Sequence, residues 1–140
     1  MTFRGADLLR SSNLLNRRIE IATLVKSSSP AFVEAAAVLK EDLGDGISRQ
    51  ILGYGPEIMI VRVWFSEGSV GQVHEHFHSQ ATYVESGKFE VFIDGEKRVL
   101  GAGDSFYIAP HLDHGAVCLE PGVLIDTFSP AREDFLGEGD

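Results

Sequence analysis

The stretch GSVGQVHEHFHSQATYVESG, residues 68–87, holds three of the five histidines of a 140-residue chain. Glycines bound it, and the residues between them include many of the β-branched and aromatic types that favour strands. Alternate residues of a strand face the same side, so His74 and His76 would point the same way. Neutral imidazole is a common ligand of divalent first-row metals. The stretch therefore predicts a strand that presents a metal site.

The segments around this stretch repeat the strand pattern. EIMIVRVWF precedes it, and KFEVFI, KRVL, SFYIA, GAVCL and VLIDTF follow, separated by the turn-forming groups SGK, DGE, GAGD and EPG. The pair Asp94 and Gly95, flanked by alternating apolar residues, is a strong signal for a two-residue hairpin. Many short strands with regular turns are typical of a sandwich or a small barrel. The sequence therefore predicts an all-β domain.

The N-terminal part of the chain differs from this pattern. The serine-rich group KSSSP at 26–30 is typical of a linker, which divides the chain into an extension at 1–29 and a domain at 30–140. The extension could form a short helix over GADLLRSSNLL and then a strand over IEIATLV, or it could be disordered. Residues 31–43, AFVEAAAVLKEDL, are rich in helix formers and predict one short helix, which Gly44 and Gly46 would end.

Composition excludes several classes of partner. The net charge of -9 argues against nucleic acid and against an anionic membrane surface, because both attract Lys and Arg. No apolar run approaches the length of a membrane span, and no secretory leader is evident, so we expect a cytoplasmic protein. The single cysteine, Cys118, excludes an intrachain disulfide, and we expect it to be a small buried apolar residue.

The remaining histidines differ in their expected roles. His114 follows the segment GDSFYIAP, and a neighbouring strand could bring it opposite the first histidines, while Gln80 could add a carbonyl oxygen. We expect His78 and His111 to lie outside the site, His78 because the chain bends near Ser79. A lone histidine is more often exposed or satisfied by ordinary hydrogen bonds. The His-x-His pattern with a further histidine after a Gly-Asp turn favours a metal site instead.

These residues resemble the two cupin motifs. The stretch 68–87 matches the first motif, G-x5-H-x-H-x3–4-E-x6-G, except that Gln80 replaces the glutamate. Residues 103–118, GDSFYIAPHLDHGAVC, resemble the second motif, G-x5-P-x-G-x2-H-x3-N, through Gly103 and His114. The departures from its Pro, Gly and Asn positions are Ala109, His111 and Cys118. The resemblance implies a single-domain cupin, a double-stranded β-helix or jelly-roll barrel, preceded here by the short helical extension.

A narrower resemblance covers roughly residues 41–136. The segments EDLGDGISRQILGY, HSQATYV, GDSFYIAP and DTFSPAREDFL are similar to the small cupins of pectin degradation, the KdgF type. That resemblance implies a metal-dependent enzyme that converts 4,5-unsaturated monouronates to open-chain 4-deoxy-5-keto uronates by an isomerase-type ring opening. It also implies one divalent metal ion and a set of site residues. The implied metal ligands are His74, His76, Gln80 and His114, and the implied site-lining residues are Asp126, Phe128 and Arg132.

The chemistry of these residues is consistent with the metal ion and the reaction that the resemblance implies. Three imidazoles and an amide form a neutral ligand set, which leaves a divalent ion its full charge as a Lewis acid. Such ligands accept Ni, Fe, Mn, Co or Zn, so the metal is not identified. We expect Asp126 to shuttle a proton and Arg132 to bind a substrate carboxylate or to keep Asp126 ionised, with Phe128 as a pocket wall. Alternatively, Asp126 caps a turn, and Arg132 is a surface residue paired with Glu133 or Asp134.

Two other functions remain open at this point. One is a metal-dependent dioxygenase acting on a small molecule, and the other is a non-catalytic cupin that binds a sugar or an effector. The pairing of Asp126 with Arg132 favours the enzyme, because a binding protein has less need of a carboxylate aimed at the site. By analogy with small cupins that close an exposed strand edge, we also expect a homodimer.

Overall fold

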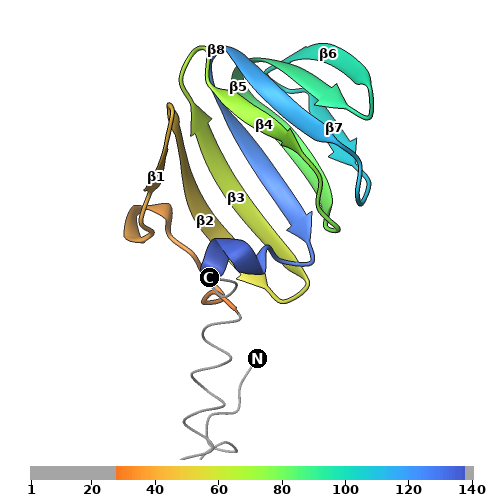
Figure 1. Cartoon of the computed structure of the whole chain (residues 1–140). Coiled ribbons are helices and arrows are strands. Elements are labelled where there is room, and N and C mark those ends of the chain that lie inside the picture. Colours follow the sequence, from red (N-terminus) through yellow and green to blue (C-terminus); the bar gives the residue numbers. More distant parts are fainter. Residues whose placement is uncertain (1–27, 138–140) are drawn as a thin grey trace, which may run out of the picture.

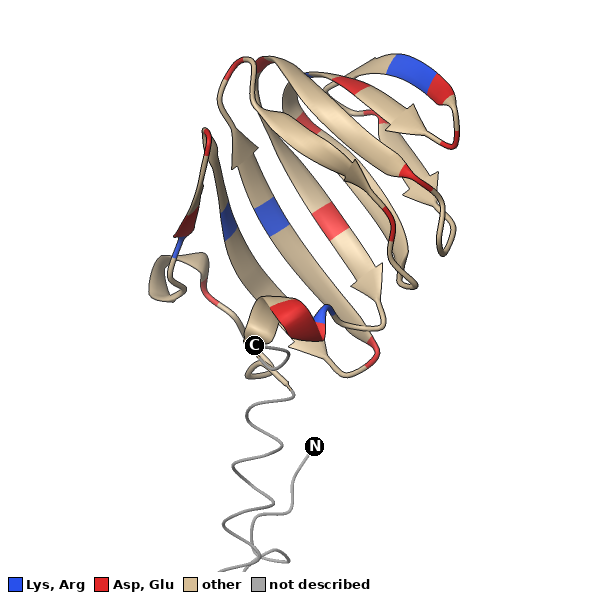
Figure 2. Cartoon of the chain, in the orientation of Figure 1, with Lys and Arg blue, Asp and Glu red and all other residues tan. Residues whose placement is uncertain are grey.

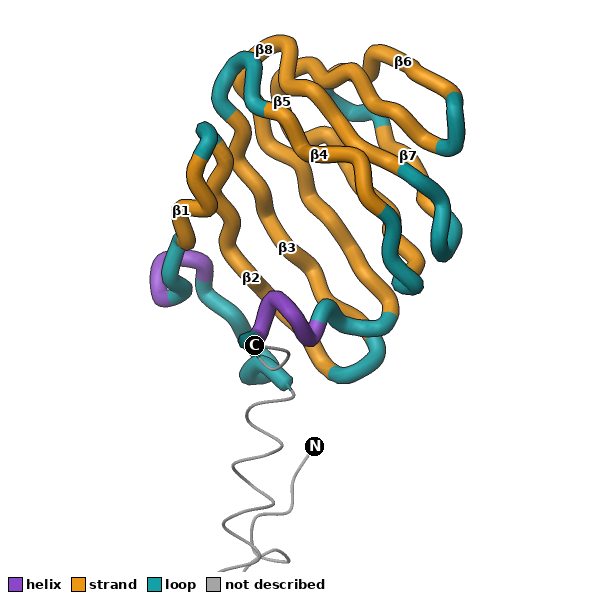
Figure 3. The backbone as a smooth tube through the Cα atoms, in the orientation of Figure 1, coloured by secondary structure: helices purple, strands orange, loops and turns teal. Residues whose placement is uncertain are grey.

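The computed structural model describes residues 28–137, and nearly all of its regular structure is β-strand (Figure 3). Two short 3₁₀ helices lie at its ends, η1 (Ala35–Ala37) and η2 (Glu133–Leu136). The eight strands are β1 (Glu41–Gly44), β2 (Ile47–Gly55), β3 (Ile58–Phe65), β4 (Val70–His74), β5 (Ser79–Ile93), β6 (Glu96–Gly101), β7 (Ser105–Ile108) and β8 (His114–Ser129). No helix among the described residues is long and apolar enough to cross a membrane.

The strands form the jelly-roll barrel that the sequence predicts. Every pairing is antiparallel, with the order β1-β2-β3-β8-β5-β6, while β4 pairs with β8 and β7 pairs with β5. The long strands β5 and β8 are shared between the two walls (Figure 1). The end of β8 pairs with β3 and its beginning with β4, and β5 pairs with β7 and then β6. The two walls therefore enclose a space between them.

The groups SGK and EPG lie inside these long strands, so the prediction that they reverse the chain was wrong. Gly87 in β5 and Gly122 in β8 meet where both strands pass from one wall to the other. A Cβ added at Gly87 would lie 2.5 Å from the Gly122 Cα, and the β5–β8 register shifts between Ser86 and Lys88. Glycine and proline mark bulges and close backbone approaches as well as turns, and here they mark a bend.

We expect the substitution Gly87→Ala to lower the free energy of unfolding by about 3 kcal/mol. Gly87 has φ +86°, where a Cβ costs roughly 1–2 kcal/mol, and the overlap with the facing backbone adds roughly 1–3 kcal/mol. Urea unfolding measures the loss. Gly95→Ala is the matched control, because Gly95 also has φ +86° but a Cβ there would meet nothing within 4 Å. Equal losses in both variants would contradict the role given to the close approach.

The β5–β6 turn confirms the hairpin predicted at Asp94 and Gly95. Ile93 pairs with Glu96, so the loop has two residues, and both have positive φ, 47° and 86°. This is the conformation expected of an Asp-Gly hairpin turn.

The helix predicted over residues 31–43 was wrong. Only Ala35–Ala37 form a 3₁₀ turn, and none of its residues is buried. Glu41–Gly44 form β1 instead, in which Glu41 pairs with Arg49. Helix propensity is a weak preference, and without an apolar face to bury it yields to strand pairing. The helix and strand predicted within 1–27 lie outside the described residues, and the division of the chain at residue 29 stays a prediction.

Two buried clusters hold the barrel walls together. The first contains Met59, Val61, Val63, Phe128 and Ala131. The second contains Val84, Phe89, Val91, Cys118 and Leu124, and Cys118 is buried as predicted. Charged residues lie both at turns and along the strands, among them basic residues on β2 and β3 and an acidic residue on β8 (Figure 2). Among the described residues, the charged side chains that line the cavity between the walls are Arg49, Asp126 and Arg132.

Candidate metal and substrate site

Three histidines converge between the two walls. Their ligand nitrogens, in His74, His76 and His114, all lie within 4.8 Å of one another. His74 ends β4 and pairs directly with His114, which begins β8, and their ring centroids are 4.3 Å apart. The His76 ring lies 4.7 Å from that of His114. The three residues that the sequence analysis selected are therefore brought together.

His76 reaches this cluster by a route that differs from the prediction. It was placed on a strand beside His74, but β4 ends at His74 and His76 lies in the following loop. Two contacts fix the loop: His76 Nδ1 lies 3.0 Å from the His78 carbonyl, and the His111 amide donates to the His76 carbonyl at 2.8 Å. Strand periodicity could not predict this position of His76, because contacts with distant residues determine the conformation of the loop.

Backbone carbonyls orient all three imidazole rings. The Nδ1 atoms of His74, His76 and His114 lie 2.8, 3.0 and 2.9 Å from the carbonyls of Gln72, His78 and Leu112. This contact favours a proton on Nδ1 and leaves Nε2 as the ligand atom. Burial also lowers the pKa values of His76 and His114, which favours the neutral, metal-binding ring.

Gln80 lies beside the three histidines, and its amide oxygen could serve as a fourth neutral ligand. Its Oε1 lies 3.0 Å from His76 Nε2, and its Nε2 donates to Thr82 Oγ1 at 3.0 Å and to Asp126 Oδ1 at 3.4 Å. The amide oxygen is thereby turned toward the histidines. Among residues 28–137, the buried His114 Nε2 has no hydrogen-bond partner. An orphaned nitrogen facing two further imidazoles and an amide oxygen fits a bound divalent cation.

Asp126 lies beside this set, on the same wall. Its partner is Thr82, whose hydroxyl donates to Asp126 Oδ1 at 2.6 Å. Withdrawal from bulk water raises the pKa of Asp126 to about 6, although the Thr82 hydrogen bond and the charge of Arg132 oppose the rise. Asp126 and Phe128 both line the pocket, as strand alternation predicts. Asp126 therefore does not cap a turn.

Thr82 is a site residue that the sequence analysis missed. It is 2% exposed and stands two residues after Gln80 on the same face of β5. Its hydroxyl accepts from the Gln80 amide and donates to Asp126, so it joins the ligand set to the carboxylate. Its position two residues after a ligand was the available signal.

Arg132 pairs with Asp134, one of the two partners expected, but its side chain is 12% exposed and so is not a surface residue. Its Nε and Nη2 donate to the two carboxylate oxygens of Asp134 at 3.1 and 2.9 Å. The same guanidinium lies 5.0 Å from the Phe128 ring and 4.2 Å from the Phe135 ring, and it lines the pocket. Arg132 is thus both ion-paired with Asp134 and part of the site.

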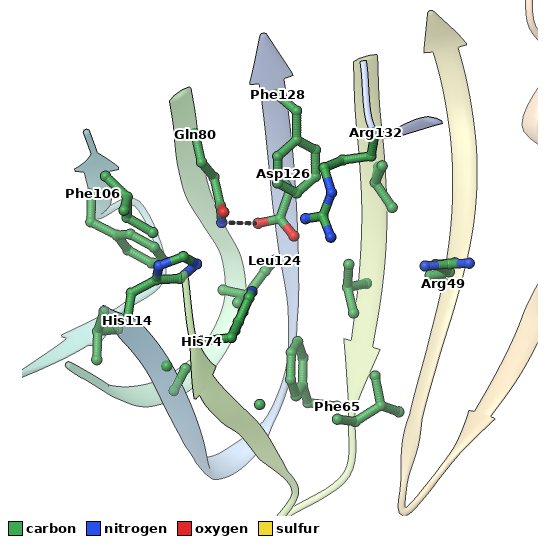
Figure 4. Close-up of a pocket in the computed structure, with 18 of the residues that line it drawn as sticks. Arg49, Phe65, His74, Gln80, Phe106, His114, Leu124, Asp126, Phe128 and Arg132 are labelled. Atoms are coloured by element: carbon green, nitrogen blue, oxygen red, sulfur yellow. Dashed lines mark hydrogen bonds between the residues drawn. The ribbon is translucent and has the colours of Figure 1, made fainter. Parts of the chain in front are cut away.

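Five of the polar residues described above line a cavity of about 310 Å³: His74, Gln80, His114, Asp126 and Arg132. Figure 4 shows His74, His114 and Gln80 on one side of it and Arg49 on the other, with Asp126 and Arg132 between them. Most of the remaining wall is apolar, from residues such as Val61, Val63, Phe65, Phe106 and Leu124. Such a mixture suits a small ligand held by a few polar groups. His78 and His111 lie outside the metal-ligand cluster, and His111 instead pairs with Glu75 at 2.8 Å.

The barrel and its cluster of three histidines are those of a small cupin, and the family model for the cupin domain matches residues 61–128. The pectin degradation protein KdgF of Dickeya dadantii is 51% identical over 98 residues, which cover 69% of this chain and 89% of that protein. The chain belongs to the KdgF family of cupins.

Solved structures agree with this assignment. An RmlC-like cupin from Shewanella frigidimarina has a TM-score of 0.76 and 53% identity, covering 78% of this chain and 98% of its own. KdgF from a Halomonas species has a TM-score of 0.73 and 43% identity, covering 76% of this chain and 99% of its own.

Proposed function

We propose that this protein is a metal-dependent enzyme that opens the ring of 4,5-unsaturated monouronates to give 4-deoxy-5-keto uronates. The observation that carries the proposal is the position of Asp126, which lies beside a neutral donor set and inside a pocket of about 310 Å³. The similarity of the chain to KdgF, a pectin degradation protein, supports a sugar-acid substrate. A carboxyl group that lines the site supports an enzyme, because a protein that only binds a ligand has less need of one.

His74, His76, Gln80 and His114 would hold one divalent ion. When bound, this ion supplies a Lewis acid that polarises substrate oxygens, and the neutral donors leave its positive charge undiminished. Their chemistry accepts Ni, Fe, Mn, Co or Zn. Residues of the chain itself then carry the proton transfers.

The reaction is an isomerisation that needs one proton moved. The anomeric hydroxyl loses its proton, the C1–O5 bond breaks as C1 becomes an aldehyde, C5 becomes a ketone, and C4 gains a proton. We assign both proton transfers to Asp126. One carboxyl oxygen would give a proton to C4 and the other would take the proton of the anomeric hydroxyl, so Asp126 ends the reaction protonated as it began. Thr82 holds Oδ1 at 2.6 Å and so sets the orientation of the carboxyl group.

Arg132 and Phe128 would complete the site. Arg132 keeps its Nη1 for a substrate oxygen, since Nε and Nη2 bind Asp134. Its charge lowers the pKa of Asp126 against the larger effect of burial, and so it stabilises the carboxylate that forms when the proton leaves. Phe128 supplies an apolar wall against the sugar ring.

The test uses purified, metal-loaded protein and freshly generated 4,5-unsaturated galacturonate. Loss of the absorbance of the conjugated C4–C5 double bond is followed against the spontaneous rate. We expect acceleration that a chelator removes and added metal restores. No acceleration by metal-loaded protein would contradict the proposal, and oxygen uptake would then test the dioxygenase alternative. The expected homodimer stays a prediction, which light scattering of the same preparation would check.

We expect Thr82→Val to lower kcat about 10-fold to 100-fold and to leave the metal content unchanged. The variant keeps the side-chain volume but removes a hydrogen bond to a carboxylate, which is worth roughly 1.5–3 kcal/mol. Steady-state kinetics with metal analysis measures both quantities. Thr82→Ser keeps the hydroxyl and should recover most of kcat. A Val variant with wild-type kcat would show that Thr82 does not position Asp126.

A further inference from the structure

The cavity has a second arginine, Arg49, which neither the cupin motifs nor the KdgF resemblance singled out. It lies on β2, pairs with Val63 of β3, and lines the cavity. Figure 2 shows basic residues on the adjacent strands β2 and β3. The one on β3, Arg62, pairs with Gln50 and so faces the opposite side of the sheet. Arg49 is therefore one of two arginines, with Arg132, that line the cavity within the described chain.

The two arginines differ in the donors that they have left for a ligand. Arg49 donates from Nε to Glu41 at 3.1 Å, and this is its one hydrogen bond within residues 28–137. Both of its terminal nitrogens are thus without a protein acceptor there, although its side chain is only 15% exposed. Arg132 already gives two nitrogens to Asp134. A carboxylate that needs two parallel donors finds them on Arg49 rather than on Arg132.

Phe135 joins the two guanidinium groups into one end of the cavity. Its ring lies 4.1 Å from the guanidinium carbon of Arg49 and 4.2 Å from that of Arg132. Both cations therefore contact the same ring, at distances suited to cation–π attraction. Two guanidinium groups thus lie at this end of the cavity, each paired with one carboxylate, Glu41 or Asp134. The histidines and Gln80 lie at the opposite end (Figure 4).

The strand spacing places Arg49 at a useful distance from Asp126. Arg49 pairs with Val63 and Val63 with Leu124, so Arg49 stands two strands away from β8. Neighbouring strands lie about 4.8 Å apart, which gives a lateral separation of about 10 Å. The substrate carboxylate is bonded to C5, next to the C4 that gains the proton, so the long Arg49 side chain would reach across this interval to the carboxylate while Asp126 faces C4.

We propose that Arg49 is the specificity-determining residue that binds the substrate carboxylate, through its two terminal nitrogens. This inference rests on the proposed function, because the substrate proposed there carries a carboxylate that the protein has to bind. Glu41 and Phe135 hold the guanidinium in place, and the apolar residues Ile47 and Val63 beside it leave its charge poorly solvated. An incoming carboxylate accepts charge-assisted hydrogen bonds from both terminal nitrogens, whereas an uncharged ester is a weaker acceptor.

The experiment compares Arg49→Gln with wild type on 4,5-unsaturated galacturonate and on its methyl ester. We expect the wild type to prefer the acid, and Arg49→Gln to lose about 10-fold to 100-fold in kcat/KM on the acid, mainly through KM, but little on the ester. Arg49→Lys, which keeps a charge without the planar fork, should fall between them. Arg62→Gln is the matched control: Arg62 also binds a carboxylate, Glu85 at 2.9 Å, and should show wild-type kinetics.

Binding of galacturonate, which lacks the C4–C5 double bond and so cannot react, separates this inference from the proposed function. Titration calorimetry of metal-loaded protein measures the affinity for galacturonate and for its methyl ester, and it requires no turnover. If the wild type fails to convert the unsaturated sugar but binds galacturonate through Arg49, the proposed function fails and the carboxylate site stands. If Arg49→Gln binds galacturonate as the wild type does, or if it still discriminates against the ester, the assignment of Arg49 is overturned. The same follows if the wild type binds neither sugar.

Discussion

Replacing Asp126 with asparagine is expected to lower kcat on 4,5-unsaturated galacturonate by a factor of about 10²–10⁴. This is the usual contribution of a side chain that transfers a proton in the transition state. The amide has nearly the shape of the carboxyl group, so the Thr82 and Gln80 contacts at 2.6 and 3.4 Å can be replaced by similar ones. The loss should therefore lie in kcat and leave the metal content unchanged.

Thermal unfolding of the same variant separates chemistry from folding. Burial disfavours the charged form of Asp126, so an uncharged amide should leave the melting temperature unchanged or raise it. Asp45→Asn, in the exposed turn between β1 and β2, is the matched control and should affect neither quantity. An Asp126→Asn protein that is folded, loaded with metal and fully active would remove Asp126 from the mechanism.

His114→Ala is expected to abolish the stabilisation that a divalent metal gives to the folded protein. The variant removes the buried Nε2 that lacks a hydrogen-bond partner. A ligand present at 1,000 times its dissociation constant stabilises the native state by about 4 kcal/mol, which corresponds to a rise of many degrees in melting temperature. We expect this rise with wild type, little of it with His114→Ala, and a loss of activity of at least about 100-fold.

Scanning fluorimetry across a panel of divalent metals, together with elemental analysis, measures this effect. His111→Asn is the matched control: the His111 ring binds Glu75 and not the cluster, and asparagine tolerates the φ of +67° at this position, so the amide that holds His76 stays in place. A His114→Ala protein that retains wild-type metal content would contradict the ligand set. So would a chelated wild-type protein that keeps its full turnover.

The sequence predicted the parts of the site that lie on regular strands. Alternation in β8 placed Asp126 and Phe128 on one face, and the Asp-Gly pair located the β5–β6 hairpin. The cupin motifs selected the three histidines that converge. Each of these features depends on local geometry or on a family pattern, so it can be read without knowledge of the neighbouring strands.

The features that the sequence did not predict depend on contacts between distant residues. Arg49 enters the site because β2 lies two strands from β8, and no spacing along the chain encodes that distance. His76 is placed by the amide of His111. The helix predicted over 31–43 was lost to strand pairing in β1, and the glycines in β5 and β8 proved to be bends because they face each other.

The continuity of β8 limits how the reaction centre can change by insertion or deletion. His114 begins this strand and Asp126 lies near its end, so one continuous strand carries both a proposed metal ligand and the proposed proton-transfer group. Adding or removing a single residue between Leu124 and Asp126 would reverse the side of the wall that Asp126 faces. Length variation should therefore be tolerated in the loops around the cavity but not within this segment, and a library of single-residue indels would map that boundary by activity.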